Sequence, residues 1–72
     1  MFYHMRELRE KHELTQRQIA DMLQVHQTTY SDYELGKVNI PVEILIQLAE
    51  YYQTSIDYLV DHTDNPKPYS RR

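Results

Sequence analysis

Cysteine is absent from this chain of 72 residues, and glycine occurs only once. Without cysteine the chain forms neither disulfides nor thiolate metal sites, so helix packing, aided by dimerisation, must stabilise a core of minimal size. Proline is confined to Pro41, Pro66 and Pro68. No apolar run is long enough to span a membrane, and no signal-peptide pattern opens the sequence. These absences predict one all-helical, cytoplasmic domain.

Positive charge is scarce as well. The Asp and Glu residues outnumber Lys and Arg, which gives a net charge of −3, whereas nucleic-acid-binding domains usually carry a basic excess. Charge alone therefore argues against DNA binding, but a ligand responds to the field of the face that it meets. The cations gather around the first predicted helices, at Arg6, Arg9, Lys11, Arg17 and Lys37. We expect weak non-specific DNA binding that depends steeply on salt.

Residues 14–36 contain the most informative pattern, two short helices joined by a tight turn. Thr15 is a suitable N-cap, and Gln18 follows at the spacing of a capping box. Apolar residues then recur at helical spacing, at Ile19, Ala20 and Leu23. Because Ala20 is small, a second helix can cross close to it. The pattern predicts a helix-turn-helix, with helices over residues 15–23 and 27–35.

The second of these helices is predicted to have one polar, free side. Thr29, Tyr30 and Tyr33 lie on its inner side, and the opposite side carries Gln27, Thr28, Ser31 and Asp32. A short helix held across another in this way is shaped to enter a DNA major groove.

The remaining helices follow from periodicity and caps. A first helix is expected from about residue 2 to residue 11, and Pro41 fits the first position of a fourth. Ser55 caps a short fifth helix. The chain then divides into a helix-turn-helix domain, residues 1–61, and a polar tail, residues 62–72, whose prolines and low apolar content predict flexibility.

Three segments of roughly residues 4–60 carry a family resemblance: MRELREKHELTQRQIADMLQV, TTYSDYELGK and PVEILIQLAEYYQTSIDYLV. The LTQ opening, the alanine at the helix crossing, the YE-x-G-K ending and the SIDYL closing helix occur together and in order. In this the chain resembles the lambda-repressor-like domain and, more narrowly, the Cro/Xre family of small phage and bacterial repressors. The resemblance implies an all-α, five-helix fold with the helix-turn-helix on helices 2 and 3.

The resemblance also implies roles for single residues. In the family, the glutamine after the capping Thr, here Gln16, binds a phosphate together with the N-terminal amides of its helix, which favour anions in general. The positions that reach base edges correspond to Gln27, Thr28 and Asp32. Arg9 and Glu34 correspond to an ion pair that clamps the first helix to the third. If that pair is buried, removing one partner would cost ~3–5 kcal/mol.

The chain departs from the family at several helix ends. Glycine is usual after the first, second and fourth helices, and Glu13, Gln24 and Gln53 stand there instead. A left-handed conformation at each would cost on the order of 1 kcal/mol relative to glycine. His26 replaces the usual Ser or Thr cap of the recognition helix, which predicts a weak cap.

Side-chain chemistry leaves several contacts open. Gln27 suits the edge of adenine, with a plain solvated glutamine as the alternative, and Thr28 offers a methyl group to thymine or a hydroxyl to phosphate. Asp32 can accept from cytosine N4, repel phosphates in wrong registers, or pair with a nearby cation. Ser31 can bond a phosphate or a base. Phosphate contacts are also expected of Arg17, Lys37 and Asn39. For Lys37 and Asn39 the alternative is a plain solvated loop without a DNA contact.

No other site is expected. The four histidines lack ligand spacing, so we predict no metal and no cofactor. No nucleophile and base converge, so the chain is predicted not to be an enzyme. Among the seven tyrosines, Tyr30, Tyr33 and Tyr52 are expected in the core. Tyr51, Tyr58 and Leu59 are expected at a dimer interface, with packing inside one monomer as the alternative.

These patterns predict a sequence-specific DNA-binding transcriptional regulator, a repressor that binds a partly palindromic operator as a homodimer. Neither a membrane nor a small-molecule ligand is expected as a partner. The alternative is a protein-interaction module, such as an antitoxin or adaptor, which keeps the fold but presents its polar helix to a protein. The acidic net charge and Asp32 motivate that alternative.

Overall fold

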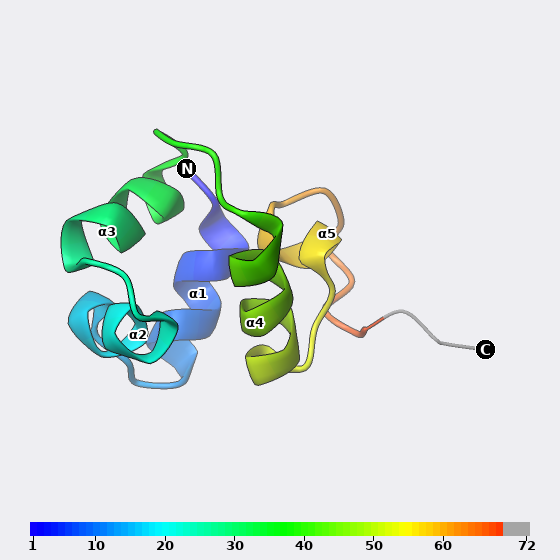
Figure 1. Ribbon diagram of the computed structural model, residues 1–72. Helices are drawn as coiled ribbons and strands as arrows, with labels where there is room; N and C mark the ends of the chain where they lie inside the picture. Colours follow the sequence, from blue (N-terminus) through cyan, green and yellow to red (C-terminus); the bar gives the residue numbers. More distant parts are fainter. Residues whose placement is uncertain (69–72) are drawn as a thin grey trace.

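The structure is a computed structural model that describes residues 1–68, and its five helices form one small bundle (Figure 1). The helices are α1 (Tyr3–Lys11), α2 (Gln16–Leu23), α3 (Gln27–Leu35), α4 (Val42–Tyr52) and α5 (Ile56–Leu59). No strand occurs within residues 1–68. None of the helices in this part of the chain is long and apolar enough to cross a membrane. The predicted all-α, five-helix fold is confirmed.

The first helix lies between the other two pairs. α2 packs against α3 on one side of α1, and α4 packs against α5 on the other (Figure 1). α1 itself contacts α3 and α5 and so joins the two pairs. The loop from residue 36 to residue 41 carries the chain from α3 across to α4 (Figure 1).

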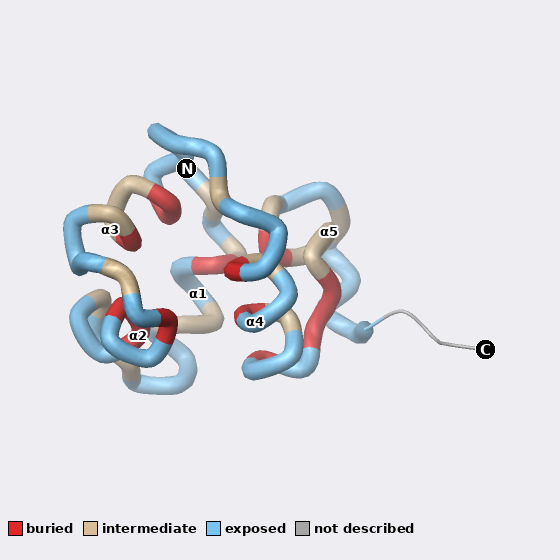
Figure 2. The backbone as a smooth tube through the Cα atoms, in the orientation of Figure 1, coloured by how far each residue is buried: buried red, intermediate tan, exposed pale blue. Residues whose placement is uncertain are grey.

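The core lies where these helices meet, and the buried stretches of the backbone turn toward it (Figure 2). Every helix contributes at least one fully or nearly fully buried side chain: Met5, Ile19, Ala20, Leu23, Tyr30, Tyr33, Ile44, Leu48, Tyr52 and Leu59. The prediction that Tyr30, Tyr33 and Tyr52 belong to the core is thereby confirmed. Within residues 1–68, the hydroxyls of Tyr30 and Tyr52 are buried without a hydrogen-bond partner.

Helix α2 begins and ends as its sequence predicts. Oγ1 of Thr15 accepts from the amide of Gln18 at 3.1 Å, and Oε1 of Gln18 accepts from the amide of Thr15 at 2.8 Å, which completes the capping box. Gln24, at its other end, adopts a left-handed conformation with φ 60°. The same conformation occurs at Glu13 (φ 57°) and Gln53 (φ 54°), so the cost considered for these positions applies to all three.

The other helices differ in whether a side chain caps their N-terminus. His26 makes no side-chain cap bond to α3, as predicted. Ser55 caps α5 by accepting from the amide of Tyr58 at 3.1 Å. Pro41 precedes α4 rather than forming its first residue, because its extended ψ of 144° makes it the N-cap. The carbonyl of Pro41 then accepts from the amides of Ile44 and Leu45.

Asp61 caps the first helix from the far end of the domain. The N-cap of α1, Phe2, has no side-chain acceptor. Instead, the Asp61 carboxylate accepts from the backbone amides of Tyr3 at 2.7 Å and His4 at 2.9 Å. The His4 ring stacks on Tyr58, with ring centroids 3.9 Å apart. Asp61 therefore ties the start of α1 to the end of α5.

The segment after residue 61 also contacts the domain. Thr54 donates from Oγ1 to the carbonyl of Pro66 at 2.7 Å, and Nε2 of His4 lies 3.3 Å from the Asp64 carboxylate. Residues 69–72 of the predicted tail lie outside the described residues. The domain boundary at residue 61 and the flexibility of the tail stay predictions.

Candidate nucleic-acid interface

Helix α3 turns one side to the body of the molecule and the other to solvent. Its inner side buries Tyr30, Tyr33 and Glu34, whereas Gln27 and Thr28 are exposed. Ser31 and Asp32, one turn further along the outer side, are half-buried. Figure 2 shows the outer edge of α3 exposed to intermediate and its inner parts buried. The four candidate base-contacting residues therefore lie at or near one open surface.

The turn before α3 fixes how this helix crosses α2. The amide of Val25 donates to the carbonyl of Ala20 at 3.0 Å, which closes the end of α2 through the left-handed Gln24. Ala20 is only 1% exposed at the crossing. A larger side chain there would push the helices apart, so the small residue is what allows the close approach.

An ion pair anchors α3 to α1. Nε of Arg9 donates to Oε2 of Glu34 at 2.6 Å, and Nη2 donates to Oε1 at 3.5 Å. The Arg9 side chain is 11% exposed and that of Glu34 only 2%. Arg9 also donates from Nη1 to the carbonyl of Leu14 at 2.8 Å, so one guanidinium joins α1, the α1–α2 loop and α3. The predicted partners thus lie together, as a buried clamp.

The clamp shifts the titration of its members. Burial disfavours the charged form of Arg9, but the hydrogen bond and charge of Glu34 outweigh that effect, and the pKa of Arg9 is raised. Burial, followed by the interaction with Glu34, raises the pKa of Tyr30 well above its ordinary value. The negative charge of the Glu34 carboxylate thus disfavours ionisation of the Tyr30 hydroxyl, although the two groups do not meet the geometry of a hydrogen bond. Arg9 is charged and Tyr30 neutral throughout the physiological range.

Gln16, the residue expected to bind phosphate, is partly engaged inside the molecule. Its Nε2 donates to Oε1 of Glu34 at 3.3 Å, which extends the clamp to the start of α2. A carboxylate only accepts, so this bond fixes which end of the amide faces Glu34. The amide group keeps a second N–H for a ligand. Gln16 is therefore both a structural link and an available donor.

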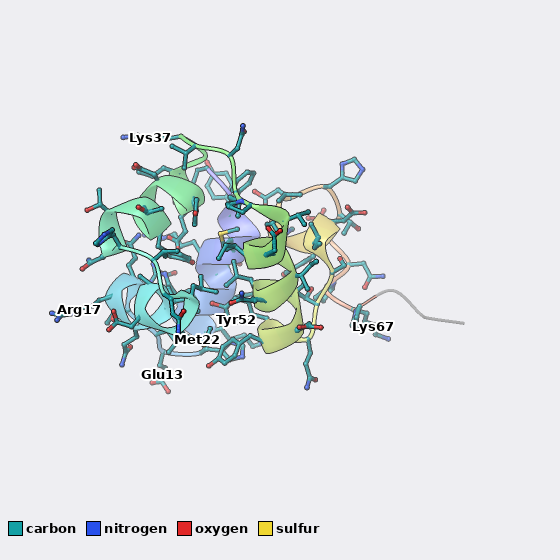
Figure 3. The ribbon with its side chains drawn as sticks, viewed as in Figure 1. Glu13, Arg17, Met22, Lys37, Tyr52 and Lys67 are labelled. Atoms are coloured by element: carbon teal, nitrogen blue, oxygen red, sulfur yellow. The ribbon has the colours of Figure 1, made fainter. Side chains whose placement is uncertain are left out.

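The other candidate phosphate contacts are exposed. Arg17, Lys37 and Asn39 all lie on the surface. In Figure 3, Arg17 and Lys37 extend on the side of the molecule that carries α3, one toward each end of that helix, whereas Lys67 lies at the opposite side. Within residues 1–68, the Asp32 carboxylate has no hydrogen bond or ion pair. The pairing of Asp32 with a nearby cation, one of its predicted options, is not made in this structure.

A hollow of about 250 Å³ opens beside the clamp. We call it the α1–α3 hollow; it is lined by Met1, Arg6, Arg9, Gln16, Ser31, Glu34 and Leu35. Its walls come from the start of the chain, from α1, from the first residue of α2 and from α3. Arg6 reaches Glu10 through Nε at 3.3 Å, and both side chains are about half exposed, at 50% and 54%.

The candidate dimer residues do not share one surface. Tyr51 is 45% exposed and Tyr58 is half-buried, but Leu59 is fully buried in the core. The expectation that Leu59 forms part of a dimer interface is therefore wrong, since its side chain has no accessible surface. Its apolar position in α5 is filled by packing within one monomer. The ring of Tyr51 packs on Tyr52 at 5.2 Å and beside His12 at 5.9 Å, centroid to centroid.

Sequence reasoning missed two features of this site. The first is the link from Gln16 to Glu34, which joins residues 18 positions apart. The second is the α1–α3 hollow, to which Arg6 contributes from α1 and Ser31 from α3. The spacing of Arg6 and Arg9 on one helical face was the available signal, because residues three apart lie side by side on a helix.

Comparison with known proteins identifies the family. The helix-turn-helix family model matches residues 5–59, more than half of the chain. The chain is 35% identical over 68 residues to YobD of Bacillus subtilis, an uncharacterized HTH-type transcriptional regulator, covering 94% of this chain and 61% of that protein. It is 31% identical over 65 residues to YqaE of the same organism, also an uncharacterized HTH-type transcriptional regulator, covering 90% of this chain and 56% of that protein.

The chain therefore spans roughly three fifths of the length of these relatives. No solved structure gave a significant match. The family match and the names of these relatives indicate a DNA-binding regulator rather than an enzyme, which agrees with the prediction from sequence. The match extends from α1 to the end of α5 and includes the capping box, the crossing at Ala20 and the Arg9–Glu34 clamp. The chain belongs to the Cro/Xre-type helix-turn-helix family of DNA-binding transcriptional regulators.

Proposed function

We propose that this chain is a sequence-specific repressor that binds a partly palindromic operator as a homodimer, with α3 in the major groove. The observation that carries the proposal is the open polar side of α3, which lies opposite a buried anchor. Gln27 and Thr28 are exposed on that side, while Tyr30 and Glu34 fix the helix from within. A recognition helix requires this combination, because base contacts need side chains that are free and a backbone that is held.

Each candidate residue has a chemical task in this proposal. Gln27 donates to and accepts from adenine, and Thr28 contacts a thymine methyl group or a phosphate. Asp32 accepts from cytosine N4, or excludes registers that would bring a phosphate to it; the lack of a partner for its carboxylate within residues 1–68 suits both tasks. Ser31 is half-buried and reaches only the groove wall. Sequence preference therefore rests mainly on Gln27 and Asp32.

Phosphate contacts supply orientation and most of the non-specific affinity. Arg17, Lys37 and Asn39 are exposed around α3, and Gln16 keeps one free N–H at the start of α2. With so few cations and a net charge of −3, non-specific binding is weak. Each phosphate contact adds about −0.9 to the slope of log K against log salt, so affinity falls steeply as salt rises.

Two copies of the chain complete the operator-binding unit. A dimer places two α3 helices in successive major grooves, which requires half-sites about one helical turn apart. The exposed Tyr51, on α4, is a candidate contact between the copies. Repression then follows from occlusion of promoter DNA.

In vitro selection from random duplexes tests this proposal. We expect enrichment of an inverted repeat with half-site centres about 10–10.5 base pairs apart. Gln27→Ala should change which bases are preferred, and Lys37→Ala should weaken all sequences alike and lower the salt slope by about 1. Glu50→Ala, on the exposed side of α4, is the control and should change neither. Selection that enriches no motif, together with specific capture of a protein, would favour the adaptor alternative instead.

A further inference from the structure

The α1–α3 hollow contains more donor groups than the clamp uses. We propose that it binds one backbone phosphate of the DNA, with Arg6 as the charged ligand and Gln16 as a second donor. This inference rests on the proposed function, since it adds a residue, Arg6, and the hollow that it lines to the phosphate contact already assigned to Gln16.

The size and position of the hollow suit such a group. Its volume of about 250 Å³ far exceeds the roughly 30 Å³ of one water molecule, so a phosphate and several waters fit together. Ser31, on α3, and Gln16, the first residue of α2, both line it. Since these two helices carry the candidate interface, a phosphate in the hollow would belong to the strand that flanks the groove occupied by α3.

The charge balance of the lining favours an anion. The Glu34 carboxylate is neutralised within the wall by Arg9, whose Nε lies 2.6 Å from Oε2. The Glu34 carboxylate also accepts from Gln16. After this pairing, Arg6 is the side chain of the lining whose charge no other lining side chain cancels. Arg6 is paired instead with Glu10, which lies outside the lining, so the hollow gains a positive group for an anion when that exposed pair opens.

The clamp orients the second donor before any ligand arrives. Glu34 holds Nε2 of Gln16 through one N–H at 3.3 Å, and the other N–H of the same nitrogen remains for a phosphate oxygen. Because the amide is already held, binding costs little side-chain entropy. The buried Glu34 therefore acts as a positioning residue for Gln16.

Arg6 can reach a phosphate only by giving up a weak partner. Its Nε lies 3.3 Å from the Glu10 carboxylate in an exposed pair one helical turn apart. Such pairs contribute about 0.2–1 kcal/mol, whereas a charged hydrogen bond to phosphate is shorter and stronger. DNA binding thus exchanges Glu10 for phosphate at Arg6, and Glu10 acts as a competitor.

Salt dependence of binding to a selected operator provides the first test, with Arg6→Gln compared with Lys67→Gln. Both variants remove one exposed positive charge, but Lys67 lies at the side opposite α3 (Figure 3). We expect Arg6→Gln to weaken binding about tenfold and to reduce the salt slope by about 0.9, with little change for Lys67→Gln. Circular dichroism and urea unfolding of both variants establish that they fold.

Glu10, which competes with phosphate for Arg6, provides a second test, in which operator affinity should rise rather than fall. Glu10→Gln should tighten operator binding about two- to fourfold, because Arg6 no longer needs to leave a charged partner. Glu50→Gln removes the same charge away from the hollow and should have a smaller effect. In the Arg6→Gln background the gain from Glu10→Gln should vanish, since the two residues act through one contact.

The results separate this inference from the proposed function. If Lys37→Ala lowers the salt slope while Arg6→Gln and Lys67→Gln behave alike, the operator is bound but the hollow does not hold its phosphate. If no operator is selected at all, the proposed function fails first. Titration with inorganic phosphate, followed by the NMR signal of the Gln16 side-chain amide, distinguishes the source: saturation at micromolar phosphate would overturn the assignment to DNA and point to a free anion.

Discussion

The two sides of α1 are joined to the rest of the molecule by different forces. Toward α3, the connection is a buried network of Arg9, Glu34 and Gln16, with bonds of 2.6–3.5 Å. Toward α4 and α5, the interior contact is apolar packing around Leu48 and Leu59, both fully buried, while polar bonds to Tyr58 and Asp61 hold the start of α1. Charged hydrogen bonds depend on direction, whereas apolar contact depends mainly on area.

This difference reflects what each side has to do. The N-cap of α3, His26, makes no side-chain bond, and the helix must leave its outer side polar, so its buried apolar surface comes from Tyr30 and Tyr33. A directional clamp fixes its angle with only a few side chains. α4, by contrast, buries Ile44, Leu48 and Tyr52 along one face and needs no such device. The precision of the recognition helix therefore rests on polar contacts, and the stability of the domain on apolar ones.

Breaking the clamp should have the largest effect. Glu34→Ala leaves the Arg9 guanidinium buried and without its anion, which we expect to lower the free energy of unfolding by about 3–5 kcal/mol. Urea unfolding measures this loss. Glu10→Ala is the matched control, since it removes an exposed carboxylate from Arg6 and should cost at most about 1 kcal/mol. Similar losses for Glu34→Ala and Glu10→Ala would show that the buried Arg9–Glu34 pair stabilises the domain no more than an exposed pair does.

The apolar side can be weakened without touching the clamp. Leu48→Ala empties space in a fully buried position of α4 and should cost about 2–5 kcal/mol by the same measurement. The sequence preference in DNA binding should then be measured for Leu48→Ala and Glu34→Ala at a temperature where both variants remain folded. Leu48→Ala should keep the sequence preference of the parent chain, whereas Glu34→Ala should blur it. A preference changed equally by both would contradict the division of labour between the two sides.

Alkaline pH should act on both sides through their buried tyrosines. Burial is the main cause that raises the pKa of Tyr30 and of Tyr52, and the charge of Glu34 adds to it. In the unfolded chain a tyrosine ionises near pH 10, while the folded form stays neutral, so stability is unaffected below that pH and falls above it. We expect a decrease of about 1.4 kcal/mol per pH unit for each tyrosine.

Urea midpoints between pH 8 and pH 11 check this expectation. Tyr30→Phe removes one of the buried tyrosines with a raised pKa and should reduce the slope above pH 10. The variant should fold well, since the Tyr30 hydroxyl has no hydrogen bond to lose. A slope that is unchanged in Tyr30→Phe would assign the alkaline transition to other groups.

The smallest expected effect is a gain in stability at the helix ends. Gln24 and Gln53 adopt φ values of 60° and 54°, which an L side chain tolerates poorly. Replacing either by glycine should stabilise the domain by about 1 kcal/mol. Gln47→Gly, on the exposed face of α4, should instead destabilise it by about 1 kcal/mol. Thermal unfolding distinguishes the two signs, and a loss at Gln24 would mean that its side chain contributes something the backbone geometry does not show.

Local signals predicted most of the fold. The capping box of Thr15 and Gln18, the Ser55 cap and the core tyrosines are all consequences of residues close in sequence or of simple periodicity. Pro41 was placed one position too far into α4, because proline is favoured at the first helical position and only its ψ decides between that position and the cap.

Contacts between distant residues were less accessible to sequence reasoning. The pairing of Arg9 with Glu34 came from the family resemblance, since nothing in the spacing of residues 25 positions apart indicates a contact. Leu59 was assigned to an interface because apolar residues of a short helix read the same whether they face a core or a partner. Asp61 gave no signal, because its task depends on where the first helix begins in space.

The contact of Asp61 with Tyr3 and His4 joins the two ends of the folded domain. The first amides of the chain's opening helix are satisfied by a carboxylate that arrives only after the closing helix has been laid down. A chain that lacked residue 61 would leave the amides of residues 3 and 4 without this acceptor. A neutral residue at position 61 would therefore weaken the start of α1 at residues 3 and 4, at the opposite end of the sequence.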